Sequence, residues 1–221
     1  MSRKPAQRAG LTEHEDLINA LVAEIKSARH GEHEKLVMTI RNLSRTPKGV
    51  EMLYQARTIP ELVALLGHKN DKYVSYALDT LHSLIRHKGN RVDLRLNYLT
   101  WFLALTLGWT RRKAPAKQQV RLCGGVEKMV DLMPRSENQL AHLQSVLFDC
   151  LSCLAYHSIE TKGIILSMGG TNQLLKIVSG YAKNTNGIND KKLTTATKLL
   201  KVLSVDDQNK AQGLLNIVYK V

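Results

Sequence analysis

The sequence predicts an all-α protein, an α-solenoid in which about four helical repeats stack against one another and one apolar loop is inserted. Three observations predict this class. Apolar pairs recur at helical spacing, two sequence markers repeat with a common period, and no segment alternates apolar and polar residues as a half-buried strand does. Aromatic residues are only 5% of the 221 residues, which is too few for a typical all-β sandwich.

Two markers define the repeat. The first is a helix with apolar pairs, and its four copies begin at Leu17, Leu62, Met129 and Leu174. The second is a leucine-rich helix end, and its four copies begin at Ile40, Leu81, Leu151 and Leu200. The intervals are 45, 67 and 45 residues for the first marker and 41, 70 and 49 for the second. A period in the low-to-mid forties is typical of HEAT and armadillo arrays, which have two or three helices per repeat.

Each repeat is expected to run from a turn through an amphipathic helix and a polar loop to a longer last helix. The polar loops are expected at 68–71, 134–137 and 182–190. The longer helices are expected over 73–86 and 140–156, among others. Because a single repeat cannot bury its apolar faces alone, stability is expected to come from stacking neighbours.

Turn residues support these boundaries. Pro60 lies just inside an expected helix start, where its missing N–H costs nothing. The pairs Gly124-Gly125 and Gly169-Gly170 are interpreted as helix ends. They lack the strand and the glycine spacing of a phosphate-binding loop.

The markers divide the chain into five segments. These are a basic tail over 1–11, a repeat over 12–55, a repeat with the insertion over 56–123, a repeat over 124–168, and a C-terminally truncated repeat over 169–221. We expect both end repeats to lack capping neighbours, which repeat arrays need for solubility. After Val205 the chain also leaves the repeat pattern.

The long interval contains an inserted apolar segment over 90–115, which holds both tryptophans, Trp101 and Trp109. Three interpretations stay open: a gene-model error such as a retained intron, a genuine lineage-specific loop, or a hairpin that contacts lipid beside the basic run 111–113. Its apolar run over 94–109 has 16 residues, which is short for a membrane span of roughly 20. An exposed segment of this kind would favour aggregation.

The charge balance points to an anionic partner. The chain has 32 Lys and Arg against 19 Asp and Glu, a net charge of +13, which suits nucleic acid, an anionic membrane or an acidic peptide. Three cysteines, an odd number, argue against a disulfide scaffold and fit a reducing compartment. The basic first ten residues precede no apolar stretch, so no secretory signal peptide is expected.

Short motifs that suggest metal or redox chemistry have simpler interpretations. Cys150 and Cys153 form a C-x-x-C on one helix face without a second pair, which favours core packing. His30 and His33 lack a third ligand at a suitable spacing. No nucleophile, base and orienting group stand at a recognisable spacing. We therefore expect no enzyme activity, no metal and no cofactor.

Six strings resemble the armadillo repeats of the β-catenin and plakoglobin family. They are Arg41–Arg45, Tyr76–Leu84, Val120–Gly125, Asp149–Tyr156, Glu160–Ile165 and Leu200–Val205. The match covers roughly 17–210 and is similar to the second to fifth repeats of an array of about twelve. The resemblance implies an armadillo-repeat α-solenoid, a right-handed superhelix. We expect a fragment or short product of an invertebrate β-catenin-like protein.

The resemblance also implies a function. In this family the third helix of each repeat lines a basic groove that binds extended acidic peptides, namely cadherin tails, T-cell-factor-type transcription factors and destruction-complex scaffolds. The implied role is a non-enzymatic scaffold and transcription coactivator that links cell adhesion to Wnt signalling. It implies the cytoplasm, the adherens junction and the nucleus. No small-molecule substrate or direct nucleic-acid contact is implied, and the membrane is reached only through a cadherin.

Seven positions match partner-binding residues of the family. They are Asn42, His82, Tyr156, Lys162, Lys191, Lys198 and Lys201, although Lys198 stands where the family has an arginine. Each lysine could instead be a solvated surface residue, and Tyr156 and His82 could be partly packed in the core. Three positions depart from the pattern: Thr194 replaces a tryptophan, His142 a lysine and Ser83 an asparagine. We expect each replacement to weaken or change binding at its subsite.

Three rival functions stay open. An importin-like or other armadillo peptide adaptor is disfavoured, because importin-type grooves use tryptophans and the candidates here are lysines. Nucleic-acid binding is disfavoured, because the insertion and the first ten residues carry more than half of the net charge, and no RNA- or DNA-binding motif is present. A non-functional truncated product is the third.

Overall fold

The computed structural model describes residues 15–27, 33–87, 116–138, 143–183 and 190–204. Every regular element in these ranges is a helix, and no strand occurs among them. The helices fall into two compact units, 1–124 and 125–221, which are considered separately. The all-α class is confirmed. The insertion 90–115, the tail 1–11, residues after 204 and His142 lie outside the described residues.

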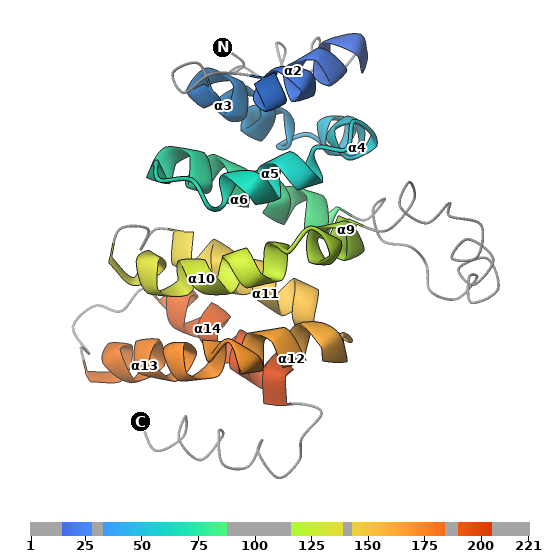
Figure 1. Ribbon diagram of the computed structural model, residues 1–221. Coiled ribbons are helices and arrows are strands. Elements are labelled where there is room, and N and C mark those ends of the chain that lie inside the picture. The colour runs from blue at the N-terminus through green and yellow to red at the C-terminus, as the bar shows by residue number, and fades with distance from the viewer. Residues whose placement is uncertain (1–14, 28–32, 88–115, 139–142, 184–189, 205–221) are drawn as a thin grey trace, which may run out of the picture. The chain divides into compact units, whose positions relative to one another are not determined.

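The first unit contains six described helices (Figure 1). They are α2 (Glu15–Ser27), α3 (His33–Leu43), α4 (Pro47–Gln55), α5 (Ile59–Leu65), α6 (Asp71–Arg86) and α9 (Ala116–Leu122). α6 packs against α3, α4, α5 and α9, and α2 packs against α3, α4 and α5. Fully buried aliphatic side chains, such as Ile40, Leu62 and Leu81, form the core between these helices.

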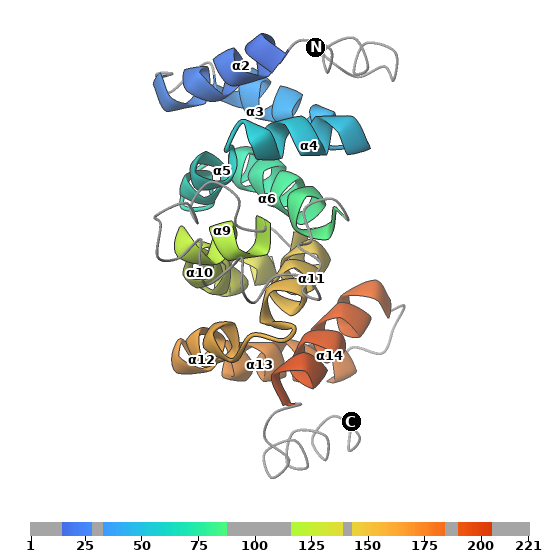
Figure 2. The same ribbon diagram turned by 90° about the vertical axis from the view of Figure 1, so that its right-hand side faces the viewer.

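The second unit contains five described helices. They are α10 (Gly125–Asn138), α11 (Gln144–Ala155), α12 (Ile159–Ser167), α13 (Gly170–Lys183) and α14 (Asp190–Ser204). The pair α11 and α14 lies side by side, as Figure 2 also shows, and α10 and α13 pack beside them. Phe148 and Leu151 of α11 are completely buried in this unit.

The glycine pairs end helices, as the sequence predicts. Gly124 and Gly169 both have φ of +72°, a left-handed conformation that glycine adopts without strain. The next residue in each case, Gly125 or Gly170, is the first residue of the following helix. The chain therefore turns from one helix into the next within two residues.

One predicted loop is wrong. The sequence suggests a polar loop over 134–137, but α10 continues through it to Asn138, with Pro134 exposed inside the helix. Leu132, Met133 and Ser136 are buried, and the Ser136 hydroxyl donates to the Met133 carbonyl at 2.7 Å. Tertiary burial of this last turn offsets the helix-breaking tendency of the proline, which costs roughly 3 kcal/mol in an isolated helix.

The predicted last helices are close to the observed ones. The helix expected over 73–86 is α6, which begins two residues earlier at Asp71 because Asn70 caps it. The Asn70 side chain accepts a hydrogen bond from the Lys72 amide at 3.0 Å. The helix expected over 140–156 is α11, which spans Gln144–Ala155 and has Leu143 as its N-cap.

Candidate functional site on the third helices

The helix of each repeat that ends with the leucine-rich marker is here called the third helix. The third helices are α3 and α6 in the first unit and α11 and α14 in the second. Within each unit the two third helices pack against each other. The residue that begins the leucine-rich marker is buried in every repeat: Ile40, Leu81, Leu151 and Leu200. This burial fixes the rotation of each helix and therefore decides which polar side chains reach its surface.

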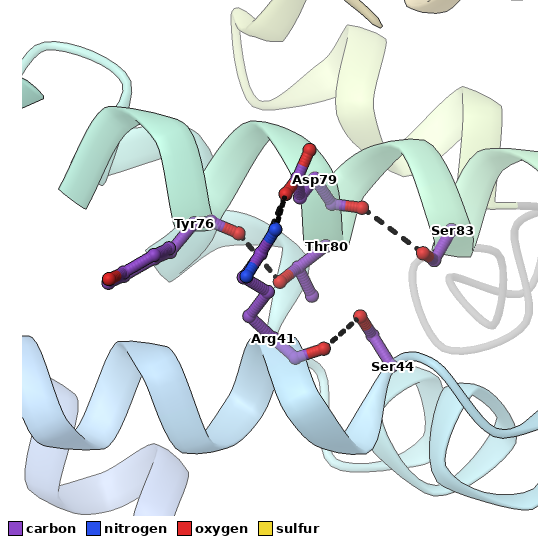
Figure 3. A network of polar contacts seen from close by, with 6 residues as sticks. All are labelled: Arg41, Ser44, Tyr76, Asp79, Thr80 and Ser83. Atoms are coloured by element: carbon purple, nitrogen blue, oxygen red, sulfur yellow. Dashed lines mark hydrogen bonds and ion pairs between the residues drawn. The ribbon is translucent and has the colours of Figure 1, made fainter. Parts of the chain in front are cut away.

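An arginine and an aspartate join α3 to α6 in the first unit (Figure 3). Arg41 Nε and Nη2 both lie 2.6 Å from Asp79 Oδ2. The Arg41 guanidinium carbon is also 5.4 Å from the centre of the Tyr76 ring, a cation–π distance. The two charged side chains are only 28% and 23% exposed, so water screens this pair less than a surface pair.

Hydroxyl groups around this pair are satisfied within their own helices. Ser44 donates to the Arg41 carbonyl at 2.8 Å, Thr80 to the Tyr76 carbonyl at 2.8 Å, and Ser83 to the Asp79 carbonyl at 3.1 Å (Figure 3). Ser83 stands where the resemblance implies an asparagine. Its short side chain is turned back to its own backbone.

A lysine and an aspartate join α11 to α14 in the second unit. Lys198 Nζ donates to Asp149 Oδ1 at 2.8 Å. The Asp149 side chain is 11% exposed, whereas that of Lys198 is 53% exposed. The carboxylate is therefore the buried partner, and the ammonium group lies at the surface.

The two aspartates occupy equivalent places in their repeats. Asp79 precedes Leu81 by two residues, and Asp149 precedes Leu151 by two residues. Each carboxylate forms an ion pair with a basic side chain of the other third helix in its own unit. Neither pair is evident from the local sequence, because Arg41 and Asp79 are 38 residues apart and Asp149 and Lys198 are 49 apart. Only the alignment of the repeat markers could have indicated them.

A second, more exposed pair also joins α3 and α6. Lys72 Nζ donates to Glu34 Oε1 at 3.0 Å, with side chains 63% and 39% exposed. The hydrogen bond and the charge of Glu34 raise the pKa of Lys72 above its usual value.

Elsewhere in this unit burial raises the pKa of Tyr54, while a hydrogen bond from Gln119 at 3.3 Å opposes that rise.

Two candidate residues lie in the first unit. Asn42, on α3, is buried, so its side chain offers little surface to a partner. His82, on α6, is half-buried. Their role in binding stays a prediction.

The other five candidates lie in the second unit. Lys201 is exposed on α14, three residues after Lys198, so both lysines lie on one side of this helix. Tyr156, the C-cap of α11, is exposed, and its ring centre lies 4.0 Å from that of His157. Lys162, in the first turn of α12, is only 7% exposed. Lys191 lies in α14, but its side chain is outside the described residues.

The described residues bring together Lys198, Lys201 and Asp149 on the packed pair α11 and α14. Thr194, where the resemblance implies a tryptophan, is exposed on the same helix α14. Among the described residues no group of three His, Cys, Asp or Glu side chains could hold a metal ion. In the same ranges no helix has both the length and the apolar character needed to cross a bilayer.

The cysteines of the C-x-x-C motif belong to the packing of α11. Cys150 is completely buried, Cys153 is half-buried, and both are free thiols. This agrees with the packing interpretation of the motif. His30 lies outside the described residues.

Comparisons with known proteins give a consistent picture, although no protein-family model matches the sequence. The chain is 32% identical over 211 residues to catenin beta of Urechis caupo, a match over 95% of this chain and 22% of that protein. It is 29% identical to junction plakoglobin of Homo sapiens, over 95% of this chain and 24% of that protein. The chain thus spans about a fifth to a quarter of the length of these relatives.

Solved structures share the fold. A chain from a structure of the interaction between cadherin and beta-catenin has a TM-score of 0.70 at 20% identity, over 92% of this chain and 32% of that chain. A designed armadillo repeat protein in complex with the peptide (KR)4 has a TM-score of 0.56 at 15% identity, over 99% of this chain and 87% of that chain. The fold is that of armadillo-repeat proteins.

Proposed function

We propose that this chain, whose armadillo repeats resemble those of the β-catenin and plakoglobin family, is a non-enzymatic scaffold that binds extended acidic peptides. The observation that carries the proposal is the exposed Lys201 beside Lys198 on the third helix α14. Both lysines belong to the helix that packs on α11, and the family resemblance implies that they contact a partner's carboxylates.

The physical basis is charge complementarity along an extended chain. Two lysines at i and i+3 present positive charge on one side of a helix, and a partner carboxylate placed against them fixes the register of the peptide. An extended peptide also has unpaired backbone N–H and C=O groups that need hydrogen-bonding side chains. The exposed Tyr156 hydroxyl supplies one such group at the end of α11.

The relatives suggest which peptides these are. The similarity to catenin beta and junction plakoglobin, and the shared fold with a chain from the cadherin and beta-catenin interaction, support a cadherin tail as the partner. By the same family argument, transcription-factor segments and destruction-complex scaffolds are further partners. The proposed places of action are the cytoplasm, the adherens junction and the nucleus, with a role in adhesion and Wnt signalling.

Titration of the full chain with a cadherin cytoplasmic-tail peptide, followed by calorimetry, tests the proposal. We expect Lys201→Glu to weaken binding at least about tenfold, because it replaces attraction by repulsion at a partner carboxylate. Lys48→Glu, an exposed position on α4, changes the net charge equally and is the control. A peptide with Asn and Gln for its acidic residues should bind poorly.

Three results would contradict the proposal. The first is that Lys201→Glu binds the cadherin-tail peptide as tightly as the wild-type chain does. The second is that Lys48→Glu loses as much affinity as Lys201→Glu. The third is that an alternating Lys-Arg peptide binds more tightly than the acidic peptide. The last result would favour an importin-like adaptor.

A further inference from the structure

We propose that Asp149 is a built-in competitor for the partner's carboxylate at Lys198, so that Lys201 rather than Lys198 is the main acidic-residue contact of α14. The inference rests on the proposed function and adds a specificity-determining residue to it. It begins from the geometry of one pair: Lys198 Nζ lies 2.8 Å from Asp149 Oδ1.

The burial of the two side chains makes the pair unequal. Asp149 is 11% exposed and Lys198 is 53% exposed. A nearly buried carboxylate has lost most of its hydration, so it gains more than a surface carboxylate from a nearby ammonium group. Lys198 has little burial to hold it in place, so the attraction of Asp149 sets its position.

A partner meets two different lysines as a result. The negative charge of Asp149 cancels much of the attraction of Lys198 for a second carboxylate. An ammonium group has three donors, so Lys198 still has N–H groups for a neutral acceptor such as a peptide carbonyl. Lys201 is exposed, and among the described residues no ion pair involves it. The carboxylate is therefore expected at Lys201 and a neutral acceptor at Lys198.

The critical variant is Asp149→Asn, which removes the charge and keeps an oxygen acceptor of similar size. The probe is a synthetic peptide of alternating Asp and Ser, with an alternating Asn and Ser peptide as its neutral match. We expect Asp149→Asn to tighten binding of the acidic peptide about threefold to fivefold, and to leave the neutral peptide unchanged. Asp131→Asn, an exposed position on α10, makes the same change in net charge and should have a smaller effect.

A double-mutant cycle identifies the lysine responsible. Lys198→Met keeps the apolar stem and removes the charge, so Asp149→Asn should gain nothing in that background. Unchanged or weaker binding by Asp149→Asn, or an equal gain with Lys198→Met present, would overturn the inference.

A second comparison does not depend on the folding of the Asp149 variant. Lys201→Met should weaken binding of the acidic peptide more than Lys198→Met does, and equal losses would overturn the inference. A different result would contradict the proposed function: the wild-type chain does not bind the acidic peptide, or Lys201→Met binds it as tightly as the wild-type chain does. If the wild-type chain binds through Lys201 but Asp149→Asn brings no gain, only this inference fails.

Discussion

Charged side chains on the third helices differ in how far water screens them, and this decides which of them stabilise the fold. The Arg41 and Asp79 side chains are 28% and 23% exposed, and the Arg41 guanidinium group lies over the Tyr76 ring. The Lys72 and Glu34 side chains are 63% and 39% exposed, although they join the same two helices. Coulomb attraction is much weaker at the second pair, because water and salt screen it.

This contrast gives a prediction for stability. Asp79→Asn should lower the free energy of unfolding by about 1–2 kcal/mol, because it leaves a partly buried guanidinium group without its carboxylate. Glu34→Gln, at the exposed pair, should cause no measurable change. Urea unfolding followed by circular dichroism checks both variants, and equal losses at the two pairs would contradict the argument.

At the scale of helices, two glycines of α12 and α13 differ in the space available for a larger side chain. A Cβ on Gly170, the first residue of α13, would lie 2.8 Å from Ile165 Cγ2 and 2.9 Å from the Ile165 carbonyl oxygen. A Cβ on Gly163, inside α12, would meet nothing within 4 Å. Gly170 allows α12 and α13 to approach closely, whereas Gly163 only weakens its own helix.

Alanine substitution at these two positions should therefore have opposite effects. Gly170→Ala is expected to destabilise the chain by about 1–3 kcal/mol, since the backbone carbonyl cannot move away cheaply. Gly163→Ala is expected to stabilise it by about 0.5–1 kcal/mol through better helix propensity. Thermal unfolding of the two variants measures the difference, and a loss of the same size in both would refute it.

The helices were predictable where the cause is local. Paired glycines, the apolar spacing and the leucine-rich marker identify α6, α11 and α14, because turn and helix preferences act over a few residues. Pro134 predicts a loop where α10 continues, because the burial of Met133 and Ser136 that holds the helix there depends on distant residues. The ion pairs of the candidate site depend on distant residues in the same way, so the local sequence does not indicate them.

The candidate site was predictable only in part. The family resemblance indicates Lys198 and Lys201, because it depends only on the sequence near each lysine. It could not distinguish Lys198, which is paired with Asp149, from Lys201, since Asp149 lies 49 residues from Lys198. Nor could it foresee that Lys162 would be buried, because that depends on how α12 packs against α10, α11 and α13.

At the scale of the whole molecule, net charge and local geometry make different demands on a partner. A charge of +13 attracts any polyanion at long range, including nucleic acid. A site built around Lys201 instead needs a carboxylate at one place on α14. The two modes of binding differ in their response to salt and to a single charge reversal.

Duplex DNA should lose roughly a hundredfold or more in affinity between about 50 and 200 mM salt, because many condensed counterions are released on binding. The alternating Asp and Ser peptide should lose about tenfold or less over the same range, because few of its charges are paired with protein cations. Lys201→Glu should weaken peptide binding at both salt concentrations and alter DNA binding no more than Lys48→Glu does. Fluorescence anisotropy with labelled peptide and labelled DNA measures all these affinities. A peptide whose affinity falls as steeply as that of DNA, and equally for the two lysine variants, would show that diffuse charge rather than the α14 site governs binding.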